Sequence, residues 1–222
     1  MTTKMINQTE KSEVTEYFNG TGFERWNRIY SSSNEVNKVQ RNIRNGHQKT
    51  IDEVLAWISK SKDLSKLSYC DAGCGVGSLS IPLALLGAKK IYASDISKSM
   101  VEETKRRAKD ASVKSSQFTC KVSDLEGITG SFDVVICLDV FIHYPQNEAE
   151  KMVQHLCSLS RNKLIVSFAP YSPFLSILKN IGKFFPGPSK TTRAYILREK
   201  GIINTAIKCG FKVKRKKLNQ AP

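Results

Sequence analysis

Short apolar runs and amphipathic segments follow one another from residue 67 onward. Residues 78–87, 98–111 and 147–160 have the three-and-four spacing of helices. The apolar runs are rich in β-branched and aromatic residues and have the length of strands; they cover residues 67–72, 90–95, 117–124, 132–140 and 162–170. This alternation predicts an α/β fold with a mostly parallel sheet and helices on both faces.

The two ends of the chain have different patterns. Residues 34–60 carry apolar side chains at helical steps, which predicts one long helix with His47 in its packed stripe. Before it, YFNGTGFERWNRIY is aromatic, and Gly20 and Gly22 allow hinging. At the other end we expect a helix at 197–209 and a strand over the basic stretch FKVKRKKL, residues 211–218. The pattern predicts a single domain, 1–222, with an N-terminal helical lid and cap over 1–62 and the α/β core over 63–222.

The charge balance points to an anionic partner. The 222 residues include 35 Lys and Arg against 20 acidic residues, a net charge of +15, and six of the basic residues fall within 208–217. Nucleic acid, an acidic membrane surface, or a carboxylate or phosphate substrate would each suit this excess. A solvated basic face is the alternative for any single lysine.

Several classes of protein are disfavoured by composition. No run reaches the roughly 18 apolar residues of a membrane span, and the first residues lack a signal-peptide core and carry acidic side chains, so we expect a cytoplasmic or stromal protein. Four of the six cysteines lie in or beside apolar runs, and they are expected to be buried hydrophobes. Neither they nor the three histidines have zinc-ligand spacing, so we expect no metal held by protein ligands alone.

A glycine-rich turn follows the first predicted strand. It contains Asp71, Gly73, Gly75 and Gly77 in the sequence DAGCGVG. Glycines at such a turn let the backbone bend tightly and approach a ligand closely. The dinucleotide fingerprint Gly-x-Gly-x-x-Gly does not fit, because the third glycine comes one place early.

Acidic residues end the next two predicted strands. Asp95 can accept hydrogen bonds from both hydroxyls of a ribose. Asp124 can accept a hydrogen bond from the amino group of an adenine, while Leu125 packs on the adenine ring. Helix capping is the alternative for Asp71 and Asp95. In this order, the features resemble the class I S-adenosylmethionine-dependent methyltransferases, which have a Rossmann-like fold. The resemblance implies S-adenosylmethionine as cofactor, bound by Asp71, Gly73, Gly75, Gly77, Asp95, Ile96, Asp124, Leu125 and Leu138.

The flanking segments narrow the resemblance. YFNGTGFERWNRIY, EVNKVQRNIRNGH, CDAGCGVGSLSIPLA, ICLDVFIHYP and FPGPSKTTRAY are together similar to the magnesium protoporphyrin IX methyltransferases of chlorophyll biosynthesis, over residues 17–195. This implies methylation of one propionate of the magnesium porphyrin to the monomethyl ester. Members of that family continue past the basic stretch into a further strand, so we expect either a truncated chain or a sheet without its last antiparallel strand.

The resemblance also implies roles for individual residues. Tyr30 and His143 are expected to orient or polarise the substrate carboxylate, and Arg193 to bind a propionate through two parallel hydrogen bonds. The alternatives are a helix-capping aromatic for Tyr30, a packing residue before Pro145 for His143, and a surface ion pair for Arg193. A propionic acid has a pKa near that of Glu, about 4.3, so it is already an anion at neutral pH and needs no general base.

The resemblance and the net charge also lead us to expect particular partners, and two competing functions stay open. We expect magnesium protoporphyrin IX as substrate and no nucleic acid, with contact to a magnesium chelatase subunit and peripheral association with an anionic photosynthetic membrane as further hypotheses. The competing functions are an RNA or other small-molecule methyltransferase, and a porphyrin-binding protein without catalysis. Against RNA, the fourth strand ends in CLDVFIHYP and not in the Asn/Asp-Pro-Pro-aromatic turn used on base nitrogens.

Overall fold

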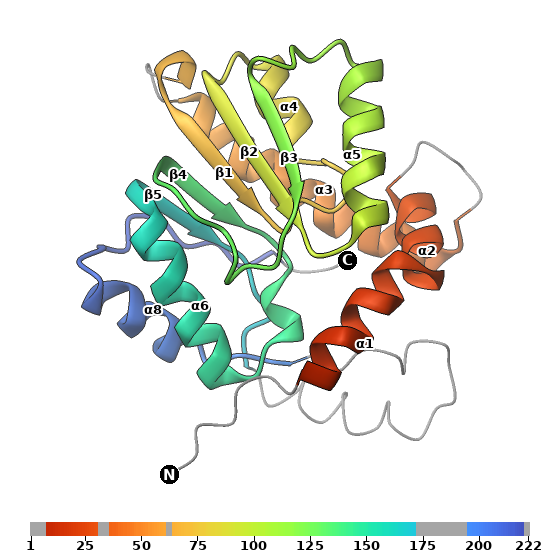
Figure 1. Cartoon of the computed structure of the whole chain (residues 1–222). Helices are drawn as coiled ribbons and strands as arrows, with labels where there is room; N and C mark the ends of the chain where they lie inside the picture. Colours follow the sequence, from red (N-terminus) through yellow and green to blue (C-terminus); the bar gives the residue numbers. More distant parts are fainter. Residues whose placement is uncertain (1–7, 31–35, 61–63, 172–194, 220–222) are drawn as a thin grey trace.

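A parallel sheet forms the centre of the fold (Figure 1). The computed structural model describes residues 8–30, 36–60, 64–171 and 195–219. Within these ranges the sheet has five strands in the order β3-β2-β1-β4-β5, and all neighbours run parallel. The strands are β1 (Ser68–Ala72), β2 (Lys90–Asp95), β3 (Phe118–Val122), β4 (Phe132–Cys137) and β5 (Ser160–Val166). The predicted α/β class and all five predicted strand positions are confirmed.

The central strand β1 defines where a ligand can bind. Tyr69 of β1 is in register with Ile91 of β2 on one side and with Val134 of β4 on the other. The strand order therefore reverses between β1 and β4, which places a topological switch point at their carboxyl ends. In Figure 1 the arrowheads of the strands point to this lower edge of the sheet.

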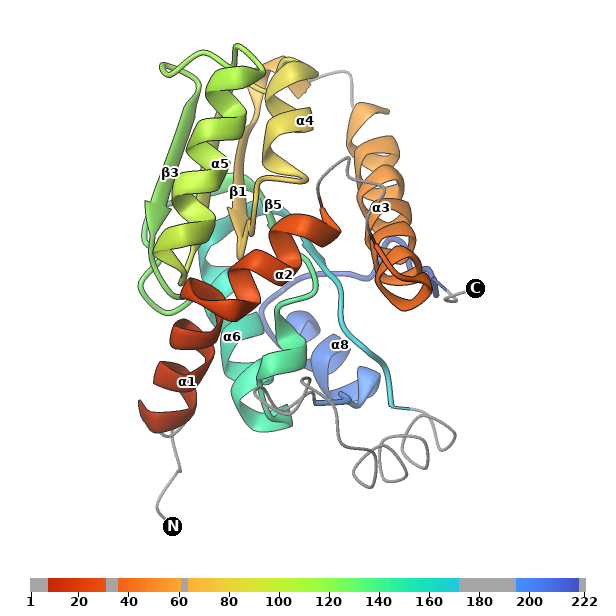
Figure 2. The same ribbon diagram turned by 90° about the vertical axis from the view of Figure 1, so that its right-hand side faces the viewer.

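Helices cover both faces of the sheet, as the two views in Figures 1 and 2 show. One face packs on α3 (Lys38–Ser59), α4 (Ser80–Leu85) and α5 (Lys98–Asp110). The other face packs on α6 (Gln146–Leu159), and α8 (Glu199–Lys208) lies outside α6. Successive side chains of a strand point to opposite faces, so Val134 and Ile136 pack toward α3 and α4 while Val135 and Cys137 pack toward α6.

Two short helices at the N-terminus lie against the sheet's carboxyl edge. They are α1 (Gln8–Asn19) and α2 (Thr21–Ile29), joined at Gly20. A Cβ atom on Gly22 would lie only 2.5 Å from the carbonyl oxygen of Tyr17, so the sharp turn between the helices requires glycine there. Ser97, just after β2, donates to the carbonyl of Phe18 over 2.8 Å and so attaches α1 to the core. Of the lid and cap region predicted over residues 1–62, α1 and α2 lie at this edge, whereas the second half of α3 packs in the core.

The long helix predicted over 34–60 is α3, which begins after a capping box formed by Asn37 and Gln40. Only the second half of its predicted apolar stripe is buried against the sheet, where Ile51, Val54 and Ile58 are at most 4% exposed. Val39 in the first half is 64% exposed.

The prediction of a strand over the basic stretch 211–218 is wrong. These residues have no strand pairing and run instead beside α3. Lys217 pairs with Glu53, and Arg215 lies over the ring of Trp57 with 5.9 Å to its centroid. Five of the eight residues are Lys or Arg, and ion pairs and ring contacts with helices take the place of a hydrogen-bonded ladder.

Candidate functional site

The glycine-rich loop after β1 has the backbone geometry that the sequence predicts. Gly73, Gly75 and Gly77 have φ values of +83°, +52° and +82°, which side-chain-bearing residues rarely adopt. A Cβ atom on Gly73 would collide with Cγ2 of Val140, whereas Gly75 has nothing within 4 Å of that position. The loop is therefore packed closely on one side and open at Gly75, where a ligand can approach the backbone.

Asp95 connects the end of β2 to this loop. Its Oδ2 accepts a hydrogen bond from the backbone N–H of Gly75 at 2.9 Å, and its Oδ1 accepts one from Ser97 N–H at 2.9 Å. Burial raises the pKa of Asp95, although these backbone hydrogen bonds oppose the shift. The carboxylate and the adjacent Ile96 border the cavity, so a ribose can be held here by an acceptor whose position the backbone fixes.

Asp71 and Gly77 support the loop from behind. The Asp71 side chain is 3% exposed and accepts a hydrogen bond from the hydroxyl of Ser80, the first residue of α4. Burial raises its pKa to about 6. A Cβ atom on Gly77 would press on Ile81 and Thr104. Neither residue borders the cavity among its described lining residues. Asp71 does not cap α4, whose N-cap position is Leu79 without a side-chain cap, and it bonds to the Ser80 side chain instead.

Asp124 links the third strand end to the lid. Its Oδ1 accepts from the N–H of Gly127 at 2.7 Å, and its Oδ2 pairs with the ammonium of Lys11 on α1. Lys11 also lies 3.3 Å from Glu126. Burial would raise the pKa of Asp124, but the hydrogen bonds from Lys11 and Gly127 outweigh it and lower the pKa. Leu125, beside it, is 4% exposed and belongs to the core that packs on α6.

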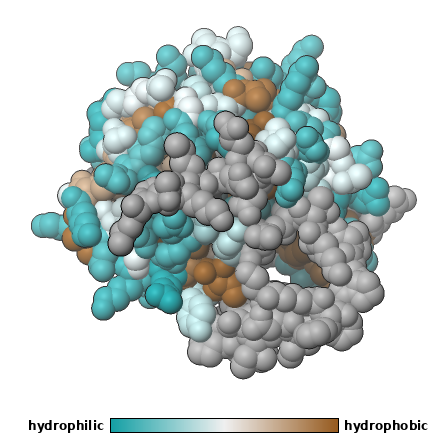
Figure 3. All heavy atoms as spheres, turned by 60° about the horizontal axis from the view of Figure 1, so that its bottom comes forward, coloured by the Kyte–Doolittle hydropathy of each residue, from teal (hydrophilic) through white to brown (hydrophobic). Residues whose placement is uncertain are grey.

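A cavity of about 2060 Å³ extends from the glycine-rich loop toward the other end of the sheet. Its wall contains Gly73, Gly75, Asp95, Ile96, Asp124, Leu125 and Leu138 from the predicted cofactor site. Most of the rest of the wall comes from α1, α2, α3, residues 139–144 after β4, β5, α8 and residues 211–219. Small-molecule pockets usually measure about 300–1,000 Å³, so this cavity has room for two ligands. Figure 3, which brings the lower side of Figure 1 forward, shows apolar brown side chains within this largely hydrophilic face.

Tyr30 lies at the end of α2, on the cavity wall. Its ring stacks on Trp26 at a centroid distance of 5.5 Å and lies 4.5 Å from the ring of His47. Burial, together with the negative charge of Asp139, raises the pKa of the Tyr30 hydroxyl. The phenol is therefore neutral at physiological pH and can donate a hydrogen bond.

His143 faces the same cavity from the 3-10 helix η2 (Phe141–His143) after β4. Its ring meets Phe18 of the lid edge-on, with centroids 5.4 Å apart. Its Nδ1 is buried and has no hydrogen-bond partner among the residues that the structure describes. Burial lowers the pKa of the imidazole to about 4. A buried polar atom without a partner is rare in folded proteins and marks a place where a ligand can complete the hydrogen bonding.

His47 is not a simple core residue, contrary to the sequence prediction. Its Nδ1 lies 2.8 Å from Oδ2 of Asp139, and its ring is covered by Tyr30. Asp139 has a φ of +60° and also accepts a hydrogen bond from Ser167 at 2.7 Å. The signals in the sequence were a histidine within an apolar helix stripe and an acid directly after a strand. Sequence reasoning missed this pair because 92 residues separate its members.

Two other predictions remain to be placed. Arg193 lies outside the residues that the structure describes. Within the described ranges, no three His, Cys, Asp or Glu side chains converge as a metal site, and no helix there is long and apolar enough to cross a membrane.

Two family models and two curated proteins resemble the chain. The chain matches the family described as magnesium-protoporphyrin IX methyltransferase C-terminus over residues 137–222, and a general methyltransferase domain over residues 70–163. It is 48% identical over 209 residues to the magnesium protoporphyrin IX methyltransferase, chloroplastic, of Arabidopsis thaliana, covering 94% of this chain and 67% of that protein. Over 206 residues it is 51% identical to the magnesium-protoporphyrin O-methyltransferase of Synechocystis sp. PCC 6803, covering 93% of this chain and 89% of that protein.

Two solved structures also resemble the chain. The crystal structure of magnesium protoporphyrin IX methyltransferase from Synechocystis PCC 6803 with bound SAH superposes with a TM-score of 0.86 at 48% identity, covering 95% of this chain and 93% of that one. The structure of the same protein with bound SAM gives a TM-score of 0.84 at 42% identity, covering 100% of this chain and 94% of that one.

Proposed function

The chain belongs to the magnesium-protoporphyrin IX methyltransferase family, and from this premise we propose how its cavity carries out the reaction. The enzyme transfers a methyl group from S-adenosylmethionine to a propionate carboxylate of magnesium protoporphyrin IX and forms the monomethyl ester. The observation that carries the proposal is that the glycine-rich loop, Tyr30 and His143 border one cavity of about 2060 Å³. That volume admits a cofactor and a second, larger ligand together.

The loop and the strand ends fit the cofactor. Gly75 leaves open space beside the backbone, and Asp95 presents a carboxylate that two backbone N–H groups already hold in place. We assign the ribose hydroxyls to Asp95 and the adenine to Asp124 and Leu125, while Asp71 and Gly77 keep the loop in shape. Bound S-adenosylmethionine supplies an electrophilic methyl group on a sulfonium sulfur.

The substrate carboxylate needs orientation more than activation. Its pKa is about 4.3 by analogy with Glu, so it is already an anion at neutral pH and no residue has to remove a proton. What remains is to hold one oxygen in line for attack and to exclude water, both of which lower the barrier when the site is pre-arranged.

Tyr30 and His143 are suited to that orienting role. Both side chains are uncharged at neutral pH, since burial raises the pKa of Tyr30 and lowers that of His143 to about 4. Each can donate one hydrogen bond to a propionate oxygen. A neutral donor fixes the carboxylate without neutralising it, and the lone pair that attacks the methyl group stays free.

The lid excludes water from the reacting groups. Phe18 of α1 and Trp26 of α2 line the cavity, and Phe18 covers the ring of His143. Helix α1 of the lid is tied to the cofactor site near both of its ends, by Lys11 on Asp124 and by Ser97 on the Phe18 carbonyl. Closure over the cofactor therefore brings the apolar rings onto the site at the same time.

Mass spectrometry tests the substrate assignment. Purified protein is incubated with S-adenosylmethionine and with magnesium protoporphyrin IX, metal-free protoporphyrin or RNA in separate reactions. We expect a mass gain of one CH₂ unit on the magnesium porphyrin. A gain on RNA alone would overturn the proposal, and a gain on both porphyrins alike would remove magnesium from the specificity.

Membrane association is a further part of the proposal, and the basic stretch 211–218 supports it only in part. Lys216 and Lys217 are paired with Glu199 and Glu53, which leaves Lys212 and Lys214 exposed and without an ion pair among the described residues. Vesicle flotation with anionic and neutral lipids measures the effect, with a Lys212→Gln/Lys214→Gln variant for comparison. We expect binding to anionic vesicles that about 1 M salt releases, since the Debye length then falls to about 3 Å. Equal binding to neutral vesicles would contradict an electrostatic contact.

Contact with a magnesium chelatase subunit remains a prediction from the family resemblance, and none of the described contacts bears on it. Co-sedimentation of the purified protein with the chelatase subunits, with and without the porphyrin, is the test. An absence of co-sedimentation under both conditions would remove the prediction.

A further inference from the structure

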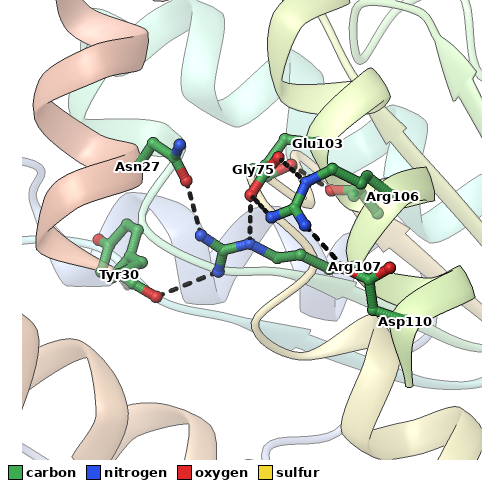
Figure 4. A network of polar contacts seen from close by, with 8 residues as sticks. Asn27, Tyr30, Gly75, Glu103, Arg106, Arg107 and Asp110 are labelled. Atoms are coloured by element: carbon green, nitrogen blue, oxygen red, sulfur yellow. Dashed lines mark hydrogen bonds and ion pairs between the residues drawn. The ribbon is translucent and has the colours of Figure 1, made fainter. Parts of the chain in front are cut away.

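The last turn of α2 is held by arginines from two other helices. Arg107 of α5 donates from Nη1 to the carbonyl oxygen of Tyr30 at 3.1 Å and from Nη2 to Oδ1 of Asn27 at 2.6 Å (Figure 4). From the other side, Arg44 of α3 donates to the carbonyls of Arg28, at 3.1 Å, and Ile29. The final carbonyls of a helix have no partner within the helix, so these guanidinium groups complete the hydrogen bonding at its end.

Arg107 is itself fixed by a buried carboxylate. Its Nε donates to Oε1 of Glu103 at 2.7 Å, and Glu103 is 8% exposed. Arg106 binds the same carboxylate through Nε and Nη2, both at 2.8 Å. The hydrogen bond from Arg106, with that from Arg107, lowers the pKa of Glu103 to about 2 against the effect of burial. Glu103 is therefore ionised at every working pH and keeps the Arg107 fork aimed at α2.

The same helix also holds the cofactor loop. Thr104, three residues before Arg107, is fully buried and donates from Oγ1 to the carbonyl of Gly75 at 2.7 Å. Residues three apart lie on one side of a helix, so Thr104 and Arg107 make their contacts from the same side of α5. One face of α5 thus joins the loop that binds the cofactor to the helix end that carries Tyr30.

We propose that Arg107 is a positioning residue for methyl transfer, which fixes the backbone of Tyr30 so that its phenol stays beside His47 in the cavity. The carbonyl and the side chain of Tyr30 are separated by a single α-carbon, so holding the carbonyl limits the directions that the ring can take. The second hydrogen bond from Arg107, to Asn27 one turn earlier, prevents the helix end from rotating about the hydrogen bond to the Tyr30 carbonyl. The proposal rests on the proposed role of Tyr30.

Arg106 provides a matched control on the same helix. Its side chain is 60% exposed, and it pairs with Glu103 and, at 2.6 Å, with Asp110. Among the described residues, its contacts thus stay within α5, whereas Arg107, which is 21% exposed, reaches α2. Replacing either arginine removes one cation next to Glu103, but replacing Arg107 alone releases Tyr30.

The experiment compares Arg107→Ala, Arg107→Lys and Arg106→Ala by steady-state kinetics, calorimetry with S-adenosylmethionine and thermal unfolding. We expect kcat to fall by about tenfold to a hundredfold for Arg107→Ala while the cofactor affinity changes less than about threefold. Arg107→Lys should recover little, because an ammonium cannot form the two parallel contacts. Arg106→Ala should keep kcat within about twofold. An unchanged kcat in Arg107→Ala would overturn the proposal.

A double-mutant cycle with Tyr30→Phe separates positioning from a general structural effect. If Arg107 acts through the Tyr30 hydroxyl, Arg107→Ala should lower kcat less than about twofold in the Tyr30→Phe protein. Full additivity of the two losses would overturn the proposal. A fully active Tyr30→Phe would instead overturn the proposed role of Tyr30, and the positioning role with it. If Arg107→Ala does not fold, Asn27→Ala removes one of the two contacts without disturbing Glu103, and it must show the same dependence on Tyr30.

Discussion

His47 and Asp139 form a contact between the long N-terminal helix and the loop after the fourth strand, with Nδ1 of His47 2.8 Å from Oδ2 of Asp139. The ring of Tyr30 lies against His47 of this pair, with ring centroids 4.5 Å apart. Burial would raise the pKa of Asp139, but the hydrogen bonds from His47 and Ser167 and the charge of His47 lower it. The carboxylate is therefore ionised and can hold the imidazole in one orientation.

The first prediction concerns this pair. His47→Ala and Asp139→Asn should each lower kcat by about tenfold or more, because the first removes the ring on which Tyr30 rests and the second removes the charge that orients that ring. Binding of S-adenosylmethionine, measured by calorimetry, should change little, since neither side chain touches the glycine-rich loop. Gln48→Ala, on the exposed side of the same helix, is the control. Equal kcat values for all three variants would show that the pair only supports the fold.

Tyr30 and His143 should act on the substrate and not on the cofactor. We expect His143→Phe and Tyr30→Phe to bind S-adenosylmethionine normally and to methylate about tenfold to a thousandfold more slowly, the range for an orienting hydrogen bond. Raising the pH should not restore the rate, because no proton is abstracted. Both variants turning over at the parental rate would leave the carboxylate to another group, and Arg193 would be the next residue to replace.

Asp95 should control cofactor affinity. Loss of a charged acceptor costs about 1.5–3 kcal/mol for each hydrogen bond it makes, so Asp95→Ala should weaken S-adenosylmethionine binding at least about tenfold. Asp95→Asn keeps the shape and one acceptor oxygen, and it should lose less. Calorimetry on both variants gives the comparison. Unchanged binding in Asp95→Ala would show that the contacts with Gly75 and Ser97 are the whole function of this carboxylate.

The buried imidazole of His143 predicts a dependence of stability on pH. Burial lowers its pKa from 6.5 to about 4 in the folded state. The unfolded chain takes up a proton below its ordinary pKa while the folded protein does not, so the free energy of unfolding falls as the pH drops from 6.5 toward 4. The His143 imidazole accounts for up to about 3 kcal/mol of this fall in the free energy of unfolding. His143→Phe should lack this part of the loss in urea titrations at several pH values. Parallel pH curves for the two proteins would show that the imidazole is solvated.

Much of the fold follows from local pattern. The five strands and α3 to α6 coincide with runs of alternating or helical spacing, because a buried face needs apolar residues at regular steps. The cofactor loop was also predictable, since a turn with three positive φ angles requires glycines in the places where Gly73, Gly75 and Gly77 stand.

Contacts between distant parts of the chain could not be predicted in the same way. Nothing near His47 indicates that its partner is Asp139, and nothing near Asp71 shows whether it faces a ligand or Ser80. The basic stretch 211–218 resembles a strand by its apolar positions alone, but the acids of α3 and α8 that pair with Lys216 and Lys217 decide its path. These outcomes depend on tertiary contacts, which override weak local preference.

The strand order also has a consequence for how fast the chain folds. β1 pairs with β2 about twenty residues later, as Tyr69 does with Ile91, but its other neighbour is β4, where Tyr69 meets Val134. The centre of the sheet is thus completed only after a loop of more than sixty residues closes. Topologies dominated by such distant pairings fold on the slower side of the range for single domains. A nascent chain without β4 would leave one edge of β1 unpaired. Residues 132–137 must therefore be synthesised before β1, which leads into the glycine-rich loop, has both of its neighbouring strands.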